Sequence, residues 1–484
     1  MKLFEPLAIK GMVLPNRIMV PAMVTRMADE EGWVTQDIVD RYVRYARGGA
    51  GLIVLEAIAV HHVKAGQLLR ISEDKFIPGL AELVRRVRDA SDSKFVPQII
   101  HFLKVSRSGW RQTVDMLSLE DIDLIVEQFG DAVRRTREAG FDGAELHAAH
   151  AYTLASFLSR RNGRTDAYTG QTLEGRLHLI GRVIENVRRK VGHDFPVAIR
   201  YNADEFIKDG YTIGDAKLIA LRLAQLGFDY LSLSVGGKFE DAEHVPGQIL
   251  FPYTGYSGDR CMPGDWYPPA LHVNLAAEIR AFINGKGYHV PVAAAGKLDD
   301  PADAERVLTE GKVDFVAIAR GLLADPDWPI KVRRGETDRL VKCDYCNVCK
   351  HLAGTHKKVN CFLWPKGSLQ APAYDPAADA PSWGPDRGGL TATVEAGSAT
   401  LTWSKAAGAA RYDVYRADDS GEVRVEDAVK GTHFVDRNVL AGMRYRYYVR
   451  ACGASGQPGP PSTSVVIEPP LPAYMPAPGP AQVA

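Results

Sequence analysis

The stretch Glu138-Ala-Gly-Phe-Asp-Gly-Ala-Glu-Leu-His147 contains the unit from which the first part of the chain is built. A helical pattern over Ile122–Glu138 ends at a glycine, and a short apolar strand, Gly143–His147, follows at once. The same alternation of helix and apolar strand recurs up to about residue 335. The expected strands are Arg17–Val20, Leu52–Leu55, Phe95–Ile99, Gly143–His147, Val197–Arg200, Tyr230–Ser234, Val290–Ala293 and Phe315–Ile318.

These strands are rich in Val, Ile and Leu, as expected of parallel strands that helices cover on both faces. Eight such units in about 335 residues predict an α/β fold of the (β/α)8 or TIM barrel type. A doubly wound open sheet would also alternate strands and helices. That alternative is weaker, because no glycine-rich dinucleotide fingerprint follows the first strand.

The pattern changes after residue 367. Residues 368–389 read as a linker rich in Pro, Ala and Asp, and from Leu390 the apolar residues alternate with a period of two. We expect a small all-β sandwich there, with a core that contains Leu401, Trp403, Val414, Tyr445, Tyr447 and Val449. The predicted organisation is a barrel (1–335), a cysteine-rich segment (336–367), the linker, the sandwich (390–468) and a Pro-rich tail (469–484).

The composition excludes several classes of protein. The 484 residues include 59 basic and 59 acidic side chains, without a sustained basic block, so we expect no nucleic-acid binding. The longest apolar stretch, Gly51–Val60, contains Glu56 and is too short to cross a membrane. Glu5 and Pro6 interrupt the apolar run that a signal peptide needs, so we expect a soluble cytoplasmic protein.

Four of the six cysteines form the motif Cys343-x2-Cys346-x2-Cys349-x11-Cys361. Four thiolates can bind either zinc or an iron–sulfur cluster. A structural zinc site usually has two separate two-cysteine knuckles, whereas three cysteines at this spacing with a distant fourth favour a [4Fe–4S] cluster. Cys261 and Cys452 are isolated, and we interpret them as small packing residues.

A second group of reactive side chains follows the fourth predicted strand. His147, His150 and Tyr152 lie where that strand ends, and in a parallel barrel this end faces the active site. Two imidazoles and a phenol can hold a carbonyl oxygen and deliver a proton. They could instead be satisfied polar residues of a turn, but three such groups at this position favour a catalytic role.

Other polar residues sit at the same ends of further strands. Ala294-Ala-Gly-Lys297 and Ala319-Arg-Gly321 follow the last two strands, where barrels commonly bind phosphate. Gln98 and Arg200 lie within apolar strands, where either a bound heterocycle or polar contacts inside the barrel would satisfy them. His244, in the long loop after the sixth strand, is more simply read as a solvated residue.

Several of these stretches resemble the Old Yellow Enzyme family of FMN-dependent oxidoreductases. The resemblance covers residues 1–367 and rests on Asn16-Arg-Ile-Met-Val-Pro-Ala-Met23, Gly49-Ala-Gly-Leu-Ile53, Gln98-x2-His101, Gly140-Phe-Asp-Gly-Ala-Glu-Leu-His147 and Phe157-Leu-Ser-x2-Asn162-x-Arg-Thr-Asp166-x-Tyr168-x-Gly170. The cysteine motif is similar to that of the branch that includes 2,4-dienoyl-CoA reductase and trimethylamine dehydrogenase. That branch carries FMN and a [4Fe–4S] cluster.

The resemblance implies a role for each matching residue. Those implied to contact FMN are Pro21, Ala22, Met23, Ala57, Gln98, Arg200, Gly296, Lys297, Ala319 and Arg320, the last four at the phosphate. His147 and His150 are implied to anchor a substrate oxygen, and Tyr152 to donate a proton. The implied cluster ligands are Cys343, Cys346, Cys349 and Cys361.

Three departures from the family are visible. Met23 stands where trimethylamine dehydrogenase-like proteins carry a cysteine joined to flavin, so FMN is expected to be non-covalent. His101-Phe-Leu-Lys104 replaces the usual continuation of that motif, so one wall of the site differs. No G-x-G-x-x-G follows residue 367; instead the sandwich resembles a fibronectin type III domain, with Tyr445 at its tyrosine corner.

The resulting hypothesis is an ene-reductase that reduces an alkene conjugated to a carbonyl or thioester. One alternative is a flavin dehydrogenase that passes electrons through the cluster to a carrier protein, and another is a non-catalytic electron-transfer subunit. The electron donor is NAD(P)H or a protein partner, and we expect a homo-oligomer. The loop Gly236–Pro269 is expected to form much of the substrate wall, and the sandwich to contribute no chemistry.

Overall fold

The computed structural model describes residues 1–64, 66–105, 110–238, 253–375, 381–395, 397–419, 421–454 and 456–470. His244 and nearly all of the Pro-rich tail therefore lie outside the described residues. The chain forms two compact units. The first contains Met1–Thr337 and Lys342–Phe362, and the second contains Asp338–Val341 and Leu363–Ala484.

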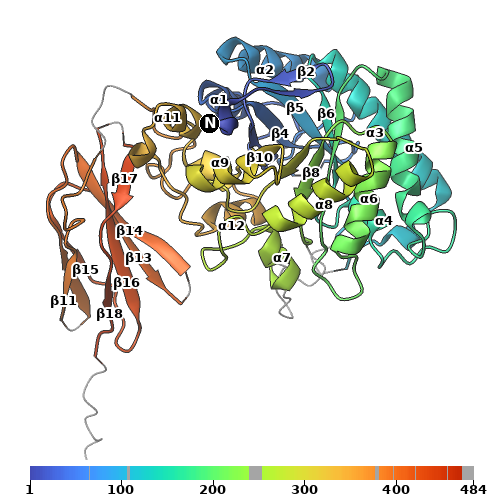
Figure 1. Ribbon diagram of the computed structural model, residues 1–484. Helices are drawn as coiled ribbons and strands as arrows, with labels where there is room; N and C mark the ends of the chain where they lie inside the picture. Colours follow the sequence, from blue (N-terminus) through green and yellow to red (C-terminus); the bar gives the residue numbers. More distant parts are fainter. Residues whose placement is uncertain are drawn as a thin grey trace, which may run out of the picture. The chain divides into compact units, whose positions relative to one another are not determined.

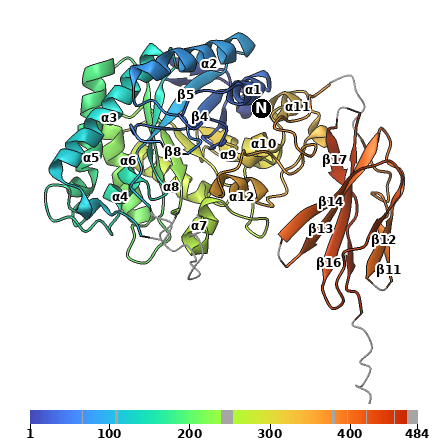
Figure 2. The same ribbon diagram turned by 180° about the vertical axis from the view of Figure 1, so that it is seen from behind.

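Eight parallel strands of the first unit close into a barrel (Figures 1 and 2). Its last strand pairs with both its first and its seventh, with Val316 opposite Ile18 and Ala294. The predicted TIM barrel is thus confirmed, and each expected strand is found with small shifts at its ends. In spatial order the strands are β3 (Ile18–Val20), β4 (Leu52–Ala59), β5 (Lys94–Ile100), β6 (Ala144–Ala148), β7 (Val197–Asn202), β8 (Leu231–Ser234), β9 (Val292–Ala294) and β10 (Phe315–Ala317).

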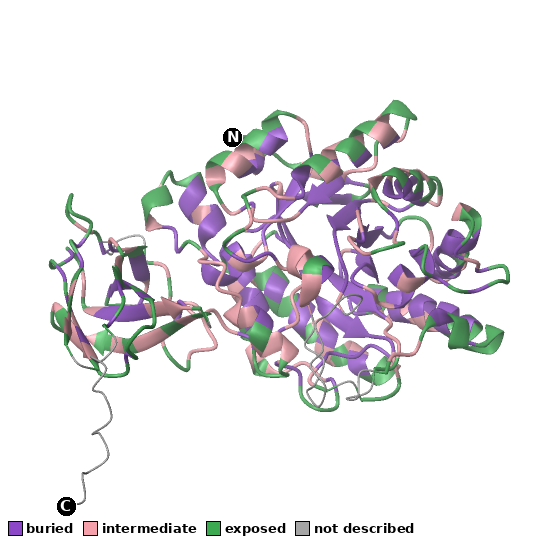
Figure 3. Cartoon of the chain, turned by 90° about the horizontal axis from the view of Figure 1, so that it is seen from below, coloured by how far each residue is buried: buried purple, intermediate pink, exposed green. Residues whose placement is uncertain are grey.

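Amphipathic helices surround the strands and turn their apolar faces inward (Figure 3). The first turns of two of them are capped: Ser118 and Asp121 form a capping box, and Asp300 precedes a proline at the first helical position. The helices are α1 (Gln36–Arg47), α2 (Ile77–Ala90), α3 (Leu119–Glu138), α4 (Thr153–Leu158), α5 (Leu173–Val191), α6 (Ile213–Gln225), α7 (Gly255–Cys261), α8 (Val273–Gly285), α9 (Pro301–Thr309), α10 (Arg320–Ala324), α11 (Trp328–Arg333) and α12 (Val348–Gly354). Within the described ranges, none is long and apolar enough to cross a membrane.

A short hairpin closes the amino-terminal end of the barrel. Strands β1 (Leu7–Ile9) and β2 (Met12–Leu14) pair antiparallel, and their buried side chains join one core cluster with Met19, Leu52 and other strand residues. Apolar packing therefore fills that end, and a ligand can enter only from the carboxyl end of the strands.

A buried carboxylate interrupts the regular pairing of β4. The register between β4 and β5 shifts between Leu55 and Ala57, at Glu56, whose side chain is fully buried. One oxygen of Glu56 accepts a hydrogen bond from the Thr25 N–H at 3.0 Å, and the other has no hydrogen-bond partner among the described residues. Burial raises the pKa of Glu56 to about 7. This carboxylate ties the segment after β3 to the next strand.

The second unit is all-β, as predicted. One sheet contains β11 (Thr391–Glu395), β12 (Ser398–Thr402) and β15 (His433–Asp436); the other contains β13 (Arg411–Asp418), β14 (Gly421–Val429), β16 (Tyr445–Cys452), β17 (Pro458–Pro461) and β18 (Val465–Ile467). All six residues predicted for its core are buried in one cluster. The Tyr445 hydroxyl accepts a hydrogen bond from the Leu440 N–H at 3.1 Å, which is the bond of a tyrosine corner. The relation to fibronectin type III domains stays a prediction.

Replacing Glu56 with Gln should remove a pH dependence of stability. Because the pKa in the folded state, about 7, exceeds the ordinary value of 4.5, the folded protein keeps a proton that the unfolded chain has lost between these pH values. Raising the pH through this window should lower the free energy of unfolding of the native protein by up to about 3 kcal/mol. Thermal melts of both proteins from pH 5 to 8 measure this difference. The same change of melting temperature with pH in the native protein and in the variant would contradict it.

Replacing Tyr445 with Phe should destabilise the second unit by about 1 kcal/mol, because the buried Tyr445 ring loses the hydrogen bond that its hydroxyl accepts from the Leu440 N–H. Denaturant unfolding of the full chain measures the loss. Thr391→Ala is the matched control: its hydroxyl bonds Thr402 at the exposed surface, so its removal should change stability by less than about 0.5 kcal/mol. Equal effects of the two substitutions would show that the corner does not anchor the sandwich.

Candidate active site

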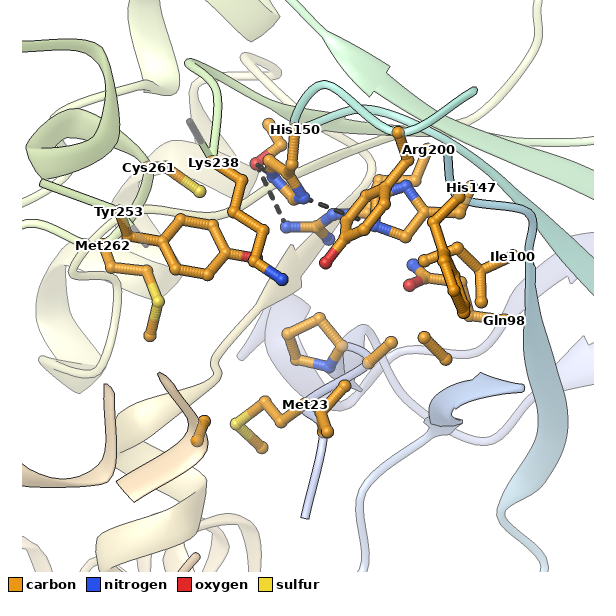
Figure 4. A pocket seen from close by; sticks show the side chains of 18 of the residues that line it. Met23, Gln98, Ile100, His147, His150, Arg200, Lys238, Tyr253, Cys261 and Met262 are labelled. Carbon is orange, nitrogen blue, oxygen red and sulfur yellow. Dashed lines mark hydrogen bonds between the residues drawn. The ribbon is translucent and has the colours of Figure 1, made fainter. Parts of the chain in front are cut away.

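A cavity of about 1300 Å³ opens at the carboxyl ends of the barrel strands. Its wall includes every barrel residue that the sequence analysis selected, although these residues come from all parts of the first 320 positions. They are Pro21, Ala22, Met23, Ala57, Gln98, His147, His150, Tyr152, Arg200, Gly296, Lys297, Ala319 and Arg320. Figure 4 shows Lys238 and Tyr253 on one side of the cavity, with Gln98 and Ile100 opposite them and Met23 below.

His147 and His150 form a buried pair at the end of β6. The Ala149 N–H donates to His147 Nδ1 at 3.2 Å, so the proton of a neutral His147 is on Nε2, which lies 3.4 Å from His150 Nδ1. His150 Nε2 lies 2.6 Å from the Ser234 hydroxyl. Burial lowers the pKa of both histidines well below the usual value, so both are neutral at neutral pH. Neutral imidazoles at this spacing can hydrogen-bond one substrate oxygen without carrying charge.

Tyr152 lies beside this pair. Its ring stands at 68° to that of His147, with the ring centres 4.8 Å apart. It interacts electrostatically with Tyr253, and burial raises the pKa of Tyr253 well above the usual value. The Lys238 ammonium lies 5.4 Å from the centre of the Tyr152 ring. The arrangement places a phenolic proton, with a second phenol behind it, next to the imidazole pair.

Gln98 and Arg200 are held by buried partners. Gln98 donates its amide N–H to Glu145 at 2.7 Å, and the Tyr230 hydroxyl donates to the other Glu145 oxygen at 3.0 Å. Arg200 donates to the hydroxyls of Ser232 and Ser234 at 3.2 and 3.3 Å. The bond to Glu145 shows which end of the Gln98 amide carries nitrogen, so the amide oxygen of Gln98 is the acceptor at this side of the cavity. The Arg200 guanidinium provides hydrogen-bond donors there. This combination suits the carbonyls and ring nitrogens of a flavin.

The two turns expected to bind phosphate lie together at the cavity. Gly296 has φ +116°, and a Cβ atom there would lie 2.7 Å from the His272 ring, so only glycine fits. The Lys297 ammonium donates to the carbonyls of Gly264 and Asp265 at 3.2 and 3.0 Å. Arg320 donates to the Pro263 carbonyl and to Asn347 Oδ1 at 2.7 and 2.6 Å. The side chains of Lys297 and Arg320 thus also support the surrounding loops.

The cysteine segment borders the same cavity. Cys349 and Tyr345 line it, and the Tyr345 ring lies 4.4 Å from the Lys297 ammonium. Cys343 interacts electrostatically with Cys349 and Cys361, and burial raises the pKa of Cys343 well above the usual value. Within the described ranges, however, no three His, Cys, Asp or Glu side chains are arranged closely enough to hold a metal ion. Four thiols in one segment are the donor set that an iron–sulfur cluster takes.

Strained backbone is concentrated around this cavity. Among the described residues, half of the non-glycine residues with positive φ line it: Arg26, His150, Ala151, Tyr253, Lys297, Tyr345 and His356. Such conformations cost about 1–3 kcal/mol each and persist only where the surroundings enforce them. Their position indicates that the fold holds side chains in fixed directions around a ligand.

Several wall residues carry no role that the sequence predicts. Tyr253 belongs to the loop predicted as substrate wall, and of that loop Lys238, Cys261, Met262 and Pro263 also contact the cavity. Residues 239–252 lie outside the described part. Cys261, interpreted above as a packing residue, is half-buried in the cavity wall. No sequence motif marks Arg26 or Lys238 as a site residue. Arg26 follows a strand end, and Lys238 follows the glycine pair Gly236-Gly237.

The comparisons with known proteins agree with this arrangement. The family described as NADH:flavin oxidoreductase / NADH oxidase matches residues 2–113, 104–246 and 270–339. The NADH oxidase of Thermoanaerobacter brockii is 34% identical over 367 residues, which are 72% of this chain and 53% of that protein. The cinnamate reductase of Clostridium sporogenes is 28% identical over 373 residues, 71% of this chain and 54% of that protein. The chain thus spans about half the length of the curated relatives it matches.

Among solved structures, a 2-naphthoyl-CoA reductase complex superposes with a TM-score of 0.67 at 23% identity, over 79% of this chain and 60% of that one. This likeness supports the fold. The matched family residues extend from β1 to beyond α11 and include every strand of the barrel. The resemblance to Old Yellow Enzyme stated above is therefore confirmed, and the chain belongs to the NADH:flavin oxidoreductase / NADH oxidase family.

Proposed function

We propose that this protein is an FMN-dependent ene-reductase, which reduces a C=C bond conjugated to a carbonyl or thioester. The observation that carries the proposal is the convergence of a neutral histidine pair and a phenol on one cavity. His147 and His150 lie side by side, and Tyr152 packs against His147. The name of the cinnamate reductase relative, an enzyme acting on an unsaturated acid, is consistent with this reaction.

The cavity suits FMN in size and in polarity. Its volume of about 1300 Å³ exceeds what a drug-sized ligand occupies, so it has room for a cofactor and a substrate. Pro21, Ala22, Met23 and Ala57 offer an apolar surface for the flavin ring, and Gln98 and Arg200 offer polar atoms for its pyrimidine side. The turns at Gly296–Lys297 and Ala319–Arg320 offer a phosphate site. When bound there, FMN would supply the hydride for the β-carbon of the alkene.

The residues of the chain itself supply orientation and a proton. The N–H groups of His147 and His150 hold the carbonyl oxygen of the substrate and polarise the conjugated alkene. The Tyr152 hydroxyl then delivers its proton to the α-carbon. Because burial keeps both histidines neutral, Tyr152 is the proton donor at this position rather than an imidazolium.

We propose further that Cys343, Cys346, Cys349 and Cys361 bind a [4Fe–4S] cluster that exchanges electrons with the cavity. The shared wall formed by Cys349 and Tyr345 supports this proposal. The second unit is proposed to be a fibronectin type III-like domain without chemistry. Its cysteine, Cys452, is fully buried, and its predicted core residues all belong to one apolar cluster.

Converting Tyr152 to Phe should slow alkene reduction about a hundredfold or more, because the proton donor is lost. Reduction of bound FMN, followed anaerobically by absorbance, should be unchanged. Tyr256→Phe is the matched control: Tyr256 is 60% exposed and should not affect turnover. Unchanged alkene turnover in the Tyr152 variant, with a large loss in a Tyr253→Phe variant, would move the proton donor to Tyr253.

The metal proposal predicts about four irons and four acid-labile sulfides per chain. Cys349→Ser should lose the iron and the sulfide, because a serine oxygen is a poor ligand for this cluster. Cys452→Ser, which alters a buried cysteine of the second unit, should retain both. Iron and sulfide assays with the visible spectrum measure the content. Stoichiometric zinc without labile sulfide would show that the four cysteines form a zinc site instead.

A further inference from the structure

Arg26 is a charged residue of the cavity wall to which the proposed mechanism gives no role. It lies after β3, half-buried, and its Nε donates to the Ala353 carbonyl at 3.1 Å. Its charge interacts with the hydroxyl groups of Tyr152 and Tyr253. Burial lowers the pKa of Arg26, which means that desolvation disfavours its charge. The fold therefore keeps a cation in the same cavity wall as Tyr152, although burial disfavours its charge.

The backbone holds Arg26 in this position. Its φ is +55°, in the left-handed region that arginine rarely adopts. The preceding residue, Thr25, is fixed on both sides: its N–H donates to Glu56, and its hydroxyl accepts from the Met27 N–H at 3.2 Å. A strained residue between two fixed neighbours indicates a side chain whose direction is maintained for binding.

The charges of the cavity wall favour an anionic ligand. Among its described residues the two carboxylates are Asp121 and Asp299. Asp121 is part of the capping box of α3, and Asp299 bonds the Tyr345 hydroxyl at the phosphate end. The cationic side chains of the wall are Arg26, Arg41, Lys104, Arg111, Arg200, Lys238, Lys297 and Arg320. FMN would account for Arg200, Lys297 and Arg320; of the other five cations, Arg26 and Lys238 interact with Tyr152 and Tyr253.

Lys238, which follows β8, lies near the same two tyrosines. Its ammonium lies 5.4 and 6.0 Å from the ring centres of Tyr152 and Tyr253 (Figure 4). Its charge also contributes to the lowered pKa of both His147 and His150. Glu56, a buried carboxylate that interacts with the charge of Arg26, has a pKa of about 7 and is only partly charged at neutral pH.

We propose that Arg26, with Lys238 beside it, binds a carboxylate carried by the alkene substrate. The substrate class is then an unsaturated carbonyl compound with a carboxylate within a few bonds of the reacting carbons. The proximity to Tyr152 sets this distance, because Tyr152 itself must reach the α-carbon. The phosphates of a coenzyme A thioester lie many bonds from its alkene, so they are not the anion that we assign to Arg26. This inference rests on the proposed ene-reductase function.

The test compares 4-oxopent-2-enoate with its methyl ester. Both contain the same alkene and ketone, and the ester is intrinsically the more electrophilic, so a preference for the acid reports recognition of its charge. We expect kcat/KM of the native holoenzyme to favour the acid about tenfold or more. Arg26→Gln should lose most of this preference, and Arg26→Lys should keep part of it. Lys208→Gln removes an exposed cation outside the cavity wall and should leave the preference intact.

A binding measurement separates this inference from the proposed reaction. Titration of the oxidised FMN protein with the saturated analogue 4-oxopentanoate, followed by the flavin spectrum, should give a dissociation constant about tenfold weaker in Arg26→Gln. The methyl ester of that analogue should bind both proteins alike. Equal kcat/KM for acid and ester in the native protein, or an unchanged preference in Arg26→Gln with normal FMN content, would overturn the inference alone. Failure to reduce either alkene with any donor, while the carboxylate still binds through Arg26, would overturn the proposed reaction alone.

Discussion

The closure of β10 onto β3 is the constraint on which the rest of the structure depends. Parallel strands in a closed ring bring all their carboxyl ends to one rim, so residues from Pro21 to Arg320 meet around one cavity although they are far apart in sequence. The β1–β2 hairpin fills the opposite end with apolar side chains, which leaves this rim as the entrance. The location of the site is therefore a consequence of topology, and its chemistry depends on which side chains stand at each strand end.

Inside the rim, buried polar groups hold one another in place. Glu145 accepts from both Gln98 and Tyr230, and Ser234 contacts both His150 and Arg200. An unpaired polar group in this interior would cost several kcal/mol, so each bond also fixes which atom of its partner remains for a ligand. The positions of the hydrogen-bond donors and acceptors are thus determined before any cofactor binds, and this is the preorganisation that the proposed hydride transfer would require.

The cysteine segment is joined to the site by shared contacts. Arg320 bonds Asn347, which lies between Cys346 and Cys349, and Tyr345 contacts both Lys297 and Arg320 through its ring. The turns proposed to bind phosphate and the segment proposed to bind the cluster therefore share one set of side chains. A change in either is expected to alter the other. The second unit, in contrast, has its own core and its own hydrogen-bonded corner at Tyr445.

The sequence by itself determined the strand and helix order, the barrel class and the all-β second unit, because hydrophobic periodicity and glycine-marked helix ends are local properties of the chain. It also determined the position of His147, Gln98 and Arg200 in the cavity wall, since a barrel places every strand end at the rim. Only the tertiary structure decided that Tyr253, Lys238 and Arg26 meet at Tyr152, and that Glu56 lies behind them. These contacts join separate loops through left-handed backbone and buried charge. No pattern along the chain encodes them, because they depend on how side chains from different strand ends pack in three dimensions.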